Sequence, residues 1–444
     1  MLTTNYRLWT RNFRGGIHPE GSKTSTDTKK ILNLLPPKKA IIPLLQHIGA
    51  ICKPLVNIGD IVKVGQKIGD AEAFVSAPVH ATISGKVVDI CPMQHPLGSK
   101  ILSIIIESDE TDTWAIKETK KEWKTLKPER IKHIIREAGI VGLGGAAFPT
   151  HVKLSPPENK KINTYILNGA ECEPFLTADH RLMLEYAKQV VTGLKILMKV
   201  SGVKKGIIAI EQNKSDALKK IKDEVNEEPN VNIDVISLKV KYPQGAEKQL
   251  IKALLKREVP SGGLPMDVGV IVSNVGTSFA VYESVVERKP LVERIVTVTG
   301  KGVSNPQNFR VRIGTPFSSL IEACEGVKEE TGKIIMGGPM MGLAQYTTDV
   351  PVIKGTSGIL VQTKNEVCDK PEECCIRCGN CASVCPMKIL PNAITNSIKN
   401  DQFEHAKEYG LLDCMECGAC TYVCPAHIPI VQYIKYGKTR LRKS

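Results

Sequence analysis

Eight cysteines in the last quarter of the chain have the spacing needed to bind iron-sulfur clusters. They form two runs with the same C-x2-C-x2-C-x3-C-P pattern. The runs are Cys375, Cys378, Cys381, Cys385 and Cys414, Cys417, Cys420, Cys424. Four thiolates bind one [4Fe-4S] cubane, and in this pattern the fourth cysteine of each run ligates the other cluster. The predicted ligand sets are Cys375, Cys378, Cys381, Cys424 and Cys385, Cys414, Cys417, Cys420.

Structural zinc is the alternative for these cysteines. Zinc sites take their four ligands from two short pairs, a pattern that does not explain two four-cysteine runs each ending in Cys-Pro. The chain has 14 cysteines, but a disulfide scaffold is typical of short secreted chains. The six cysteines outside the runs are interpreted as buried apolar residues, although Cys172 lies between two glutamates that could make it reactive.

The composition favours a multi-domain globular protein that remains in the cytoplasm. The 444 residues are 42% hydrophobic and 24% charged. No apolar run approaches the roughly 20 residues that cross a bilayer, and the first residues do not resemble a secretory signal. The net charge is +14, but the lysines are scattered and no nucleic-acid-binding motif accompanies them, so we expect no nucleic-acid partner. A basic tail at 435–444 is interpreted as solvated, or as suited to an anionic surface.

Four domains are expected between an N-terminal extension at 1–38 and the basic tail. Short strands separated by glycine turns predict a barrel-sandwich domain at 39–110, which resembles lipoyl carrier domains. No lysine occurs between Lys67 and Lys86, so this domain is expected to dock and not to carry a prosthetic group. Alternating helix and strand patterns predict a parallel α/β domain at 125–288. A small α+β domain of β-grasp type is expected at 290–364, followed by a two-[4Fe-4S] ferredoxin-like domain at 368–434.

A glycine-rich loop in the α/β domain could bind a phosphate group. The segment "GIVGLGGAAFPTHVKL" contains Gly142, Gly144 and Gly145, whose backbone N–H groups could close on an anion. No predicted strand precedes it, so it is not a Rossmann fingerprint. The loop alone does not identify a ligand.

Further motifs in the same domain connect this loop to a known family. "GLGGAAFPTHVK", "NGAECEP" with Asp179, "YPQGAEKQL" and "SNVGTSFA" resemble, in that order, motifs of the flavin-bearing NADH-oxidising subunit of respiratory complex I. Together with the sandwich domain, "MGGPMMG" and the cysteine runs, the resemblance covers almost the whole chain. It points to the C subunits of Rnf (Rsx) complexes, which are membrane-bound ion-translocating oxidoreductases.

The resemblance implies which residues bind FMN and NADH, and it implies no catalytic acid, base or nucleophile. The residues expected around FMN are Gly142, Gly144, Gly145, Lys153, Asn168, Glu171, Tyr242, Gly245, Asn274 and Thr277. Those expected to hold NADH over the flavin are Phe148, Glu173 and Glu247. The chain departs from the complex I pattern at Ala170 and Ala246, where that family has carboxylates.

The function implied by the resemblance is electron transfer between NAD(H), FMN and two [4Fe-4S] clusters, coupled to ion transport. Partners would be the other subunits of an Rnf-type complex, and the chain would lie peripherally at the cytoplasmic face of the bacterial inner membrane. Two other functions remain open. One is a soluble diaphorase subunit of a hydrogenase or formate dehydrogenase, and the other is a non-catalytic iron-sulfur scaffold.

Overall fold

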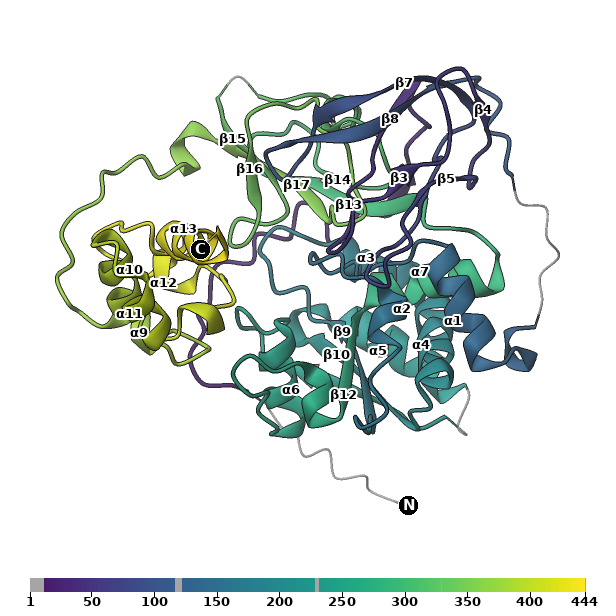
Figure 1. The fold of residues 1–444 in the computed structure, drawn as a ribbon. Coiled ribbons are helices and arrows are strands. Elements are labelled where there is room, and N and C mark those ends of the chain that lie inside the picture. Colours follow the sequence, from purple (N-terminus) through teal and green to yellow (C-terminus); the bar gives the residue numbers. More distant parts are fainter. Residues whose placement is uncertain (1–11, 116–121, 228–230, 329, 444) are drawn as a thin grey trace.

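A computed structural model describes residues 12–115, 122–227, 231–328 and 330–443 (Figure 1). Residues 1–11 of the predicted extension and Ser444 of the predicted tail lie outside this part of the chain. The ferredoxin-like helices form one lobe, and the strand-rich domains lie above the helices and sheet of the α/β domain in the view shown. The architecture is mixed α/β in several domains, as predicted.

The N-terminal domain is a sandwich of two antiparallel sheets. Inward-facing side chains such as Ile42, Ile68 and Ile104 form its core. One sheet has the order β2 (Lys39–Pro43), β8 (Lys100–Ser108), β7 (Gly85–Gln94), β4 (Ile61–Val62), and the other β3 (Lys53–Pro54), β5 (Lys67–Asp70), β6 (Val79–His80). The hairpin between β5 and β6 reaches the α/β domain, where Phe74 lies edge-on to His151 with ring centroids 5.8 Å apart.

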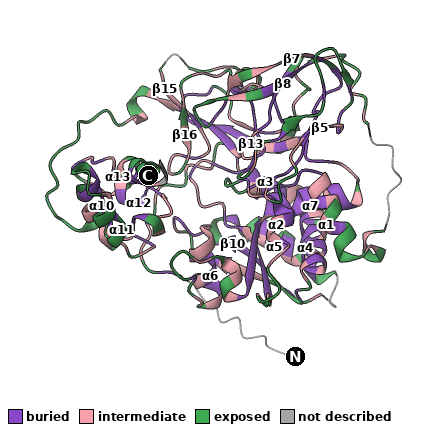
Figure 2. Ribbon diagram, in the orientation of Figure 1, coloured by how far each residue is buried: buried purple, intermediate pink, exposed green. Residues whose placement is uncertain are grey.

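The predicted parallel sheet of the α/β domain is present. All its strands are parallel, in the order β11 (Ile233–Leu238), β10 (Lys205–Glu211), β9 (Thr164–Gly169), β12 (Val270–Asn274). Its helices are α1 (Pro128–Glu137), α2 (Thr150–Lys153), α3 (Ala178–Glu185), α4 (Ala187–Ser201), α5 (Ser215–Asn226), α6 (Glu247–Leu255), α7 (Val275–Val286). Separate apolar cores cover the two faces of the sheet. Polar groups that bind a ligand are therefore expected at the ends of its strands. Figure 2 shows this burial concentrated around α4, α5 and β10.

The third domain contains a six-stranded mixed sheet and helix α8 (Phe317–Ala323). The strand order is β1 (Ile31–Asn33), β14 (Gln307–Arg312), β13 (Glu293–Thr299), β17 (Gly358–Thr363), β15 (Thr331–Met336), β16 (Leu343–Gln345). Strand β1 belongs to the N-terminal extension and pairs in parallel with β14. The extension is therefore part of the fold and supplies one edge of this sheet.

The C-terminal domain is helical, with two short helices that follow the cysteine loops. Its helices are α9 (Asn380–Ser383), α10 (Pro391–Lys399), α11 (Phe403–Glu408), α12 (Ala419–Tyr422), α13 (Ile430–Lys443). The 3-10 helices of the described residues are η1 (Trp123–Thr125), η2 (Gln212–Lys214), η3 (Pro265–Val268), η4 (Lys364–Glu366) and, within this domain, η5 (Leu411–Asp413).

The segment 435–443, expected to be a solvated basic tail, is helical, and one of its lysines makes hydrogen bonds within the ferredoxin-like domain. Helix α13 runs through it, and the ammonium group of Lys438 donates to the Cys414 carbonyl at 2.6 Å and to Glu416 at 2.8 Å. Lysine and arginine side chains on a helix can pack their aliphatic parts against the protein while their charged ends reach water. None of the described helices combines the length and the apolar character needed to span a membrane.

Residues 12–30, which we call the N-terminal strap, connect three of the domains. The Gly16 N–H donates to the Val384 carbonyl in the ferredoxin-like domain at 2.7 Å. Further along, Ile17 pairs with Tyr242 of the α/β domain. The strap then leads into β1 of the third domain.

Candidate flavin cavity and cluster sites

A cavity of about 670 Å³ lies at the carboxyl edge of the parallel sheet. Strands β9 and β12 end beside it, which places Asn168 and Asn274 in its wall. This is the edge where open α/β sheets bind their ligands. The structure brings together every predicted FMN or NADH residue except Gly145 in the lining of this one cavity. Gly145 instead forms the turn of the loop, with a φ of +115° that strongly favours glycine.

The glycine loop is tied to the beginning of helix α7. The Leu143 N–H donates to the Thr277 hydroxyl at 2.9 Å, and Asn274 caps the helix by accepting from the Gly276 N–H at 2.8 Å. A Cβ added at Gly144 would lie only 3.2 Å from Asn274 Cβ. A side chain at this position would therefore press on Asn274. The loop lies beside a helix N-terminus, an arrangement that suits a phosphate.

Lys153 and Glu247 contact each other across the cavity. Their charged groups are 2.9 Å apart, and Lys153 also donates to the Val272 carbonyl at 3.0 Å. Both side chains are about one-third exposed. Lys153 is therefore held where it can meet an anionic group, and Glu247 where it can accept hydrogen bonds.

The loop at 171–176 carries two partly buried carboxylates whose oxygens already have partners in the protein. Glu171 accepts from the Asp179 N–H at 2.7 Å, and Glu173 accepts from the Met341 N–H at 2.8 Å. Burial raises the pKa of each glutamate to about 7. Glu173 thus fastens the "MGGPMMG" loop of the third domain to the cavity wall, a contact that the motifs did not indicate.

Lys23 of the N-terminal strap organises the same loop and was not found from the sequence. Its ammonium group donates to the carbonyl oxygens of Glu171 at 3.0 Å and Glu173 at 2.9 Å, and also to that of Leu176. Glu171 and Phe175 both have positive φ angles, which are unfavourable for residues other than glycine. Lys23 therefore stabilises a strained backbone from a segment some 150 residues away in sequence.

Cys172 lines the cavity but has the environment of an unreactive thiol. Its sulfur accepts from the Gly245 N–H at 3.3 Å. Burial, with a smaller contribution from Glu211, raises the pKa of Cys172 to about 12. The thiol is therefore protonated at neutral pH, and packing is the role that fits.

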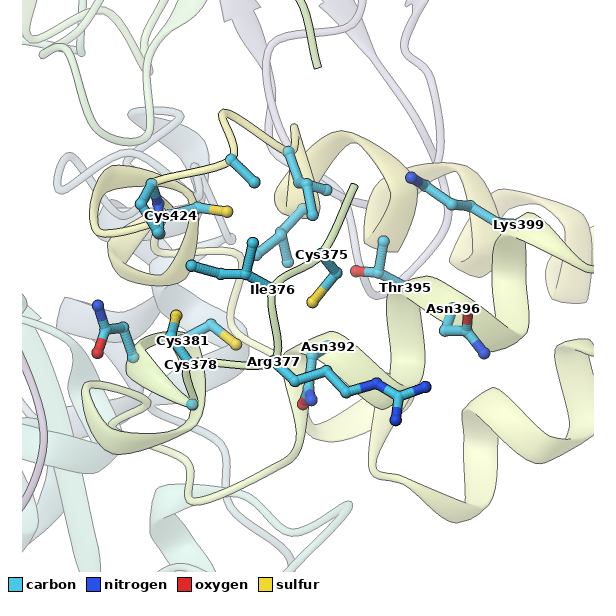
Figure 3. Close-up of a pocket in the computed structure, with 16 residues that line it drawn as sticks. Cys375, Ile376, Arg377, Cys378, Cys381, Asn392, Thr395, Asn396, Lys399 and Cys424 are labelled. Atoms are coloured by element: carbon cyan, nitrogen blue, oxygen red, sulfur yellow. The ribbon is translucent and has the colours of Figure 1, made fainter. Parts of the chain in front are cut away.

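The two predicted cluster ligand sets occupy two separate pockets. One pocket, which we call the outer cluster site, is lined by Cys375, Cys378, Cys381 and Cys424 (Figure 3). The other, the inner cluster site, is lined by Cys385, Cys414, Cys417 and Cys420. In each pocket one cysteine comes from the other run. The structure therefore groups the eight cysteines in the same two sets that the sequence spacing predicts. Gly379 and Gly418, at φ +77° and +81°, turn the loops into α9 and α12.

Each cluster site brings four cysteine thiols together in one pocket. A [4Fe-4S] cluster is held by four cysteine thiolates. The donor set of each site is four soft sulfurs, which fits iron-sulfur clusters.

The inner cluster site adjoins the flavin cavity. Cys414 and the following Met415 line both the inner site and the cavity. The outer site is more open to solvent, because Cys375 and Cys378 are exposed whereas Cys417 and Cys420 are buried. The sites are thus arranged as cavity, inner cluster, outer cluster.

Four family models match successive parts of the chain. They are the RnfC barrel sandwich hybrid domain at 11–111, the Nuo51 FMN-binding domain at 135–283, the SLBB domain at 295–344 and the 4Fe-4S dicluster domain at 369–425. The relatives match this chain over almost its whole length. The C subunit of the proton-translocating ferredoxin:NAD(+) oxidoreductase complex of Clostridium ljungdahlii is 51% identical, covering 97% of this chain and 94% of the relative. The chain belongs to the RnfC family.

Other RnfC relatives belong to complexes whose names give a different ion or none in particular. The C subunit of the Na(+)-translocating ferredoxin:NAD(+) oxidoreductase complex of Acetobacterium woodii is 48% identical, covering 97% of both chains. The corresponding subunit of the ion-translocating oxidoreductase complex of Rhodobacter capsulatus is 40% identical, covering 99% of this chain and 85% of the relative. Among solved structures, an NAD+-reducing [NiFe]-hydrogenase chain aligns with TM-score 0.49 at 17% identity over 71% of this chain and 63% of its own.

The RnfC match agrees with the geometry of the sites. The FMN-binding domain includes every predicted flavin and NADH residue, and the dicluster domain includes all eight cluster cysteines. The RnfC sandwich match begins at residue 11 and so includes the N-terminal strap. FMN and two [4Fe-4S] clusters are accordingly the cofactors that these domains bind.

Proposed function

We propose that this chain is the electron-transfer subunit of an ion-translocating ferredoxin:NAD+ oxidoreductase complex. It would pass electrons between NAD(H), FMN and two [4Fe-4S] clusters, and the reaction could run in either direction. The observation that carries the proposal is the shared lining of Cys414 and Met415, which places the flavin cavity and the inner cluster site side by side. FMN supplies the conversion between two-electron hydride transfer and one-electron transfer.

The cavity residues fit a flavin nucleotide and a dinucleotide. Gly144 lines the cavity beside the N-terminus of α7, and Lys153 adds a cation, so this end of the cavity suits the phosphate. The Gly142 N–H is donated to the Phe148 carbonyl at 2.8 Å and holds the loop in shape. Phe148 offers an aromatic face for stacking, and Glu247 can accept hydrogen bonds from ribose hydroxyls. Glu173 is occupied by Met340 and Met341, so we assign it to holding the wall and give Glu247 the larger part in dinucleotide binding.

The order of the sites implies the path through the chain. The inner site lies beside the flavin cavity, and the outer site carries exposed Cys375 and Cys378 together with exposed Ile376. Electrons would therefore exchange with partner subunits at the outer site. The other subunits of the complex would hold the chain peripherally at the cytoplasmic face of the membrane.

Quantifying iron, sulfide and FMN after anaerobic purification tests this function. About eight iron atoms and one FMN per chain, with flavin absorbance that NADH bleaches, are expected from the domains present. Clusters without flavin, and no response to NADH, would support the scaffold alternative instead. A chain that remains soluble in cells containing its partner subunits would favour the diaphorase alternative.

A further inference from the structure

We propose that Tyr242 is a positioning residue that fixes the inner cluster site against the flavin cavity and tunes the reduction potential of its cluster. The inference rests on the proposed function for the cluster assignment, and it adds a role for a side chain that touches both sites. Tyr242 lines the flavin cavity, and it packs in one apolar group with Cys417 and Ala419.

The hydroxyl of Tyr242 is directed at a cluster ligand. It donates to the Cys417 carbonyl at 2.7 Å, while the next acceptor, Glu173 Oε1, is 3.5 Å away. A tyrosine hydroxyl has one hydrogen, so the shorter contact takes it. Because Tyr242 is 1% exposed, water does not compete for this bond.

The backbone of Tyr242 is fixed from the other side by the N-terminal strap. The Ile17 N–H donates to the Tyr242 carbonyl at 2.8 Å, and the Tyr242 N–H donates to the Ile17 carbonyl at 2.9 Å. The strap also contacts the loop that ends at Cys385, where a Cβ added at Gly15 would lie 2.7 Å from the Cys385 carbonyl. Two ligands of the inner cluster are thereby held against the α/β domain, Cys417 by the tyrosine ring and Cys385 by the strap.

The bond should affect the potential because hydrogen bonds and burial around the ligands set the potential of an iron-sulfur cluster. A donor aimed at the ligand peptide places a positive dipole end near the cluster, and reduction makes the cluster more negative. The donor therefore favours the reduced state, and the apolar surroundings strengthen this effect. Removing the hydroxyl should shift the potential of the inner cluster to a more negative value.

Tyr242→Phe tests the inference, since it keeps the ring and removes only the hydroxyl. In an EPR-monitored redox titration of the full chain with its cofactors, we expect the inner cluster alone to become harder to reduce. A tenfold change in its one-electron equilibrium, equal to about 59 mV, is the expected scale. The potential of the outer cluster should not change.

Tyr165→Phe is the matched control. Tyr165 is also buried, and its hydroxyl makes a 2.7 Å bond, but to Ser273 within the sheet and not to a cluster ligand. The control should leave both cluster potentials in place. Selective loss of the inner cluster in Tyr242→Phe would also support the positioning role.

An unchanged inner-cluster potential, or an equal shift of both clusters, would overturn the inference. These results are distinguishable from failure of the proposed function. The titration measures the reduction potential of the inner cluster whether or not FMN is present. The proposed function, in contrast, fails if the wild-type chain binds no flavin.

Discussion

At the scale of single residues, Cys172 combines access to the flavin cavity with low reactivity. Its raised pKa, about 12, leaves very little thiolate at pH 8. We expect iodoacetamide to label the exposed Cys368 and Cys374 of the cofactor-loaded protein while Cys172 remains unmodified, as measured by peptide mass spectrometry. Rapid labelling of Cys172 would show that its thiol is activated and would contradict the packing role.

Glu173 should make stability depend on pH. Its native pKa of about 7 lies above the usual value of 4.5, so between these values the native state binds more protons than the unfolded state. The unfolding free energy therefore falls as pH rises through this window. Glutamine at position 173 cannot titrate. The unfolding free energy of wild type relative to Glu173→Gln should therefore fall by about 2 kcal/mol between pH 5 and pH 8. This value is smaller than the full pKa shift would give, because solvent in the cavity screens the carboxylate.

Urea unfolding of both proteins at the two pH values measures this difference. Glu171, which has a similar pKa, is present in both proteins, so its contribution cancels. A difference between wild type and variant that does not change with pH would show that Glu173 titrates normally.

The residue scale also shows what the sequence can and cannot predict. The two groups of cysteines that share a pocket were predictable, because each run places three cysteines within seven residues and its Cys-Pro ending marks the fourth. The bond between Tyr242 and Cys417 joins residues 175 positions apart, and no local pattern encodes such a contact. Glu171 and Glu173 were found by motif, but their backbone partners depend on how the domains pack.

At the scale of elements, sequence patterns missed the N-terminal strap and strand β1, which follows it. Strand β1 has only three residues and owes its structure to β14, nearly 280 positions later in the chain. The strands and helices of the α/β domain were predictable, since each has its own apolar periodicity. A strap whose partners all lie in other domains has no such periodicity.

Lys23→Met tests whether the strap organises the flavin cavity. The change removes a charged donor from three carbonyl groups of the 171–176 loop, and each such bond stabilises by about 1.5–3 kcal/mol. We expect FMN to bind at least about tenfold more weakly, a factor that needs only about 1.4 kcal/mol. Fluorescence titration of the flavin-free chain with FMN measures the effect.

Lys29→Met is the control from the same strap. Lys29 also donates to a backbone carbonyl, at 2.7 Å, but its partner is Pro306 in the third domain, away from the cavity. FMN affinity should therefore remain near that of wild type. Equal losses in the two variants would mean that the strap acts through general stability and not through the loop.

At the scale of the whole molecule, the domains converge on the route between the flavin cavity and the outer cluster. The α/β domain forms the cavity, the third domain covers part of it through Met341, and the ferredoxin-like domain adds Cys414. The strap and Tyr242 hold the inner cluster in place between them. Under the proposed function, electrons that travel between the flavin and the outer site would pass through the inner cluster.

Freeze-quenched EPR of NADH-treated Cys424→Ser and Cys420→Ser variants tests that claim most directly. In Cys424→Ser, which alters an outer ligand, NADH should still reduce the inner cluster. In Cys420→Ser, which alters an inner ligand, the flavin should still be reduced while the outer cluster stays oxidised. Normal reduction of the outer cluster in Cys420→Ser, or loss of the inner signal in Cys424→Ser, would contradict the proposed order of the sites.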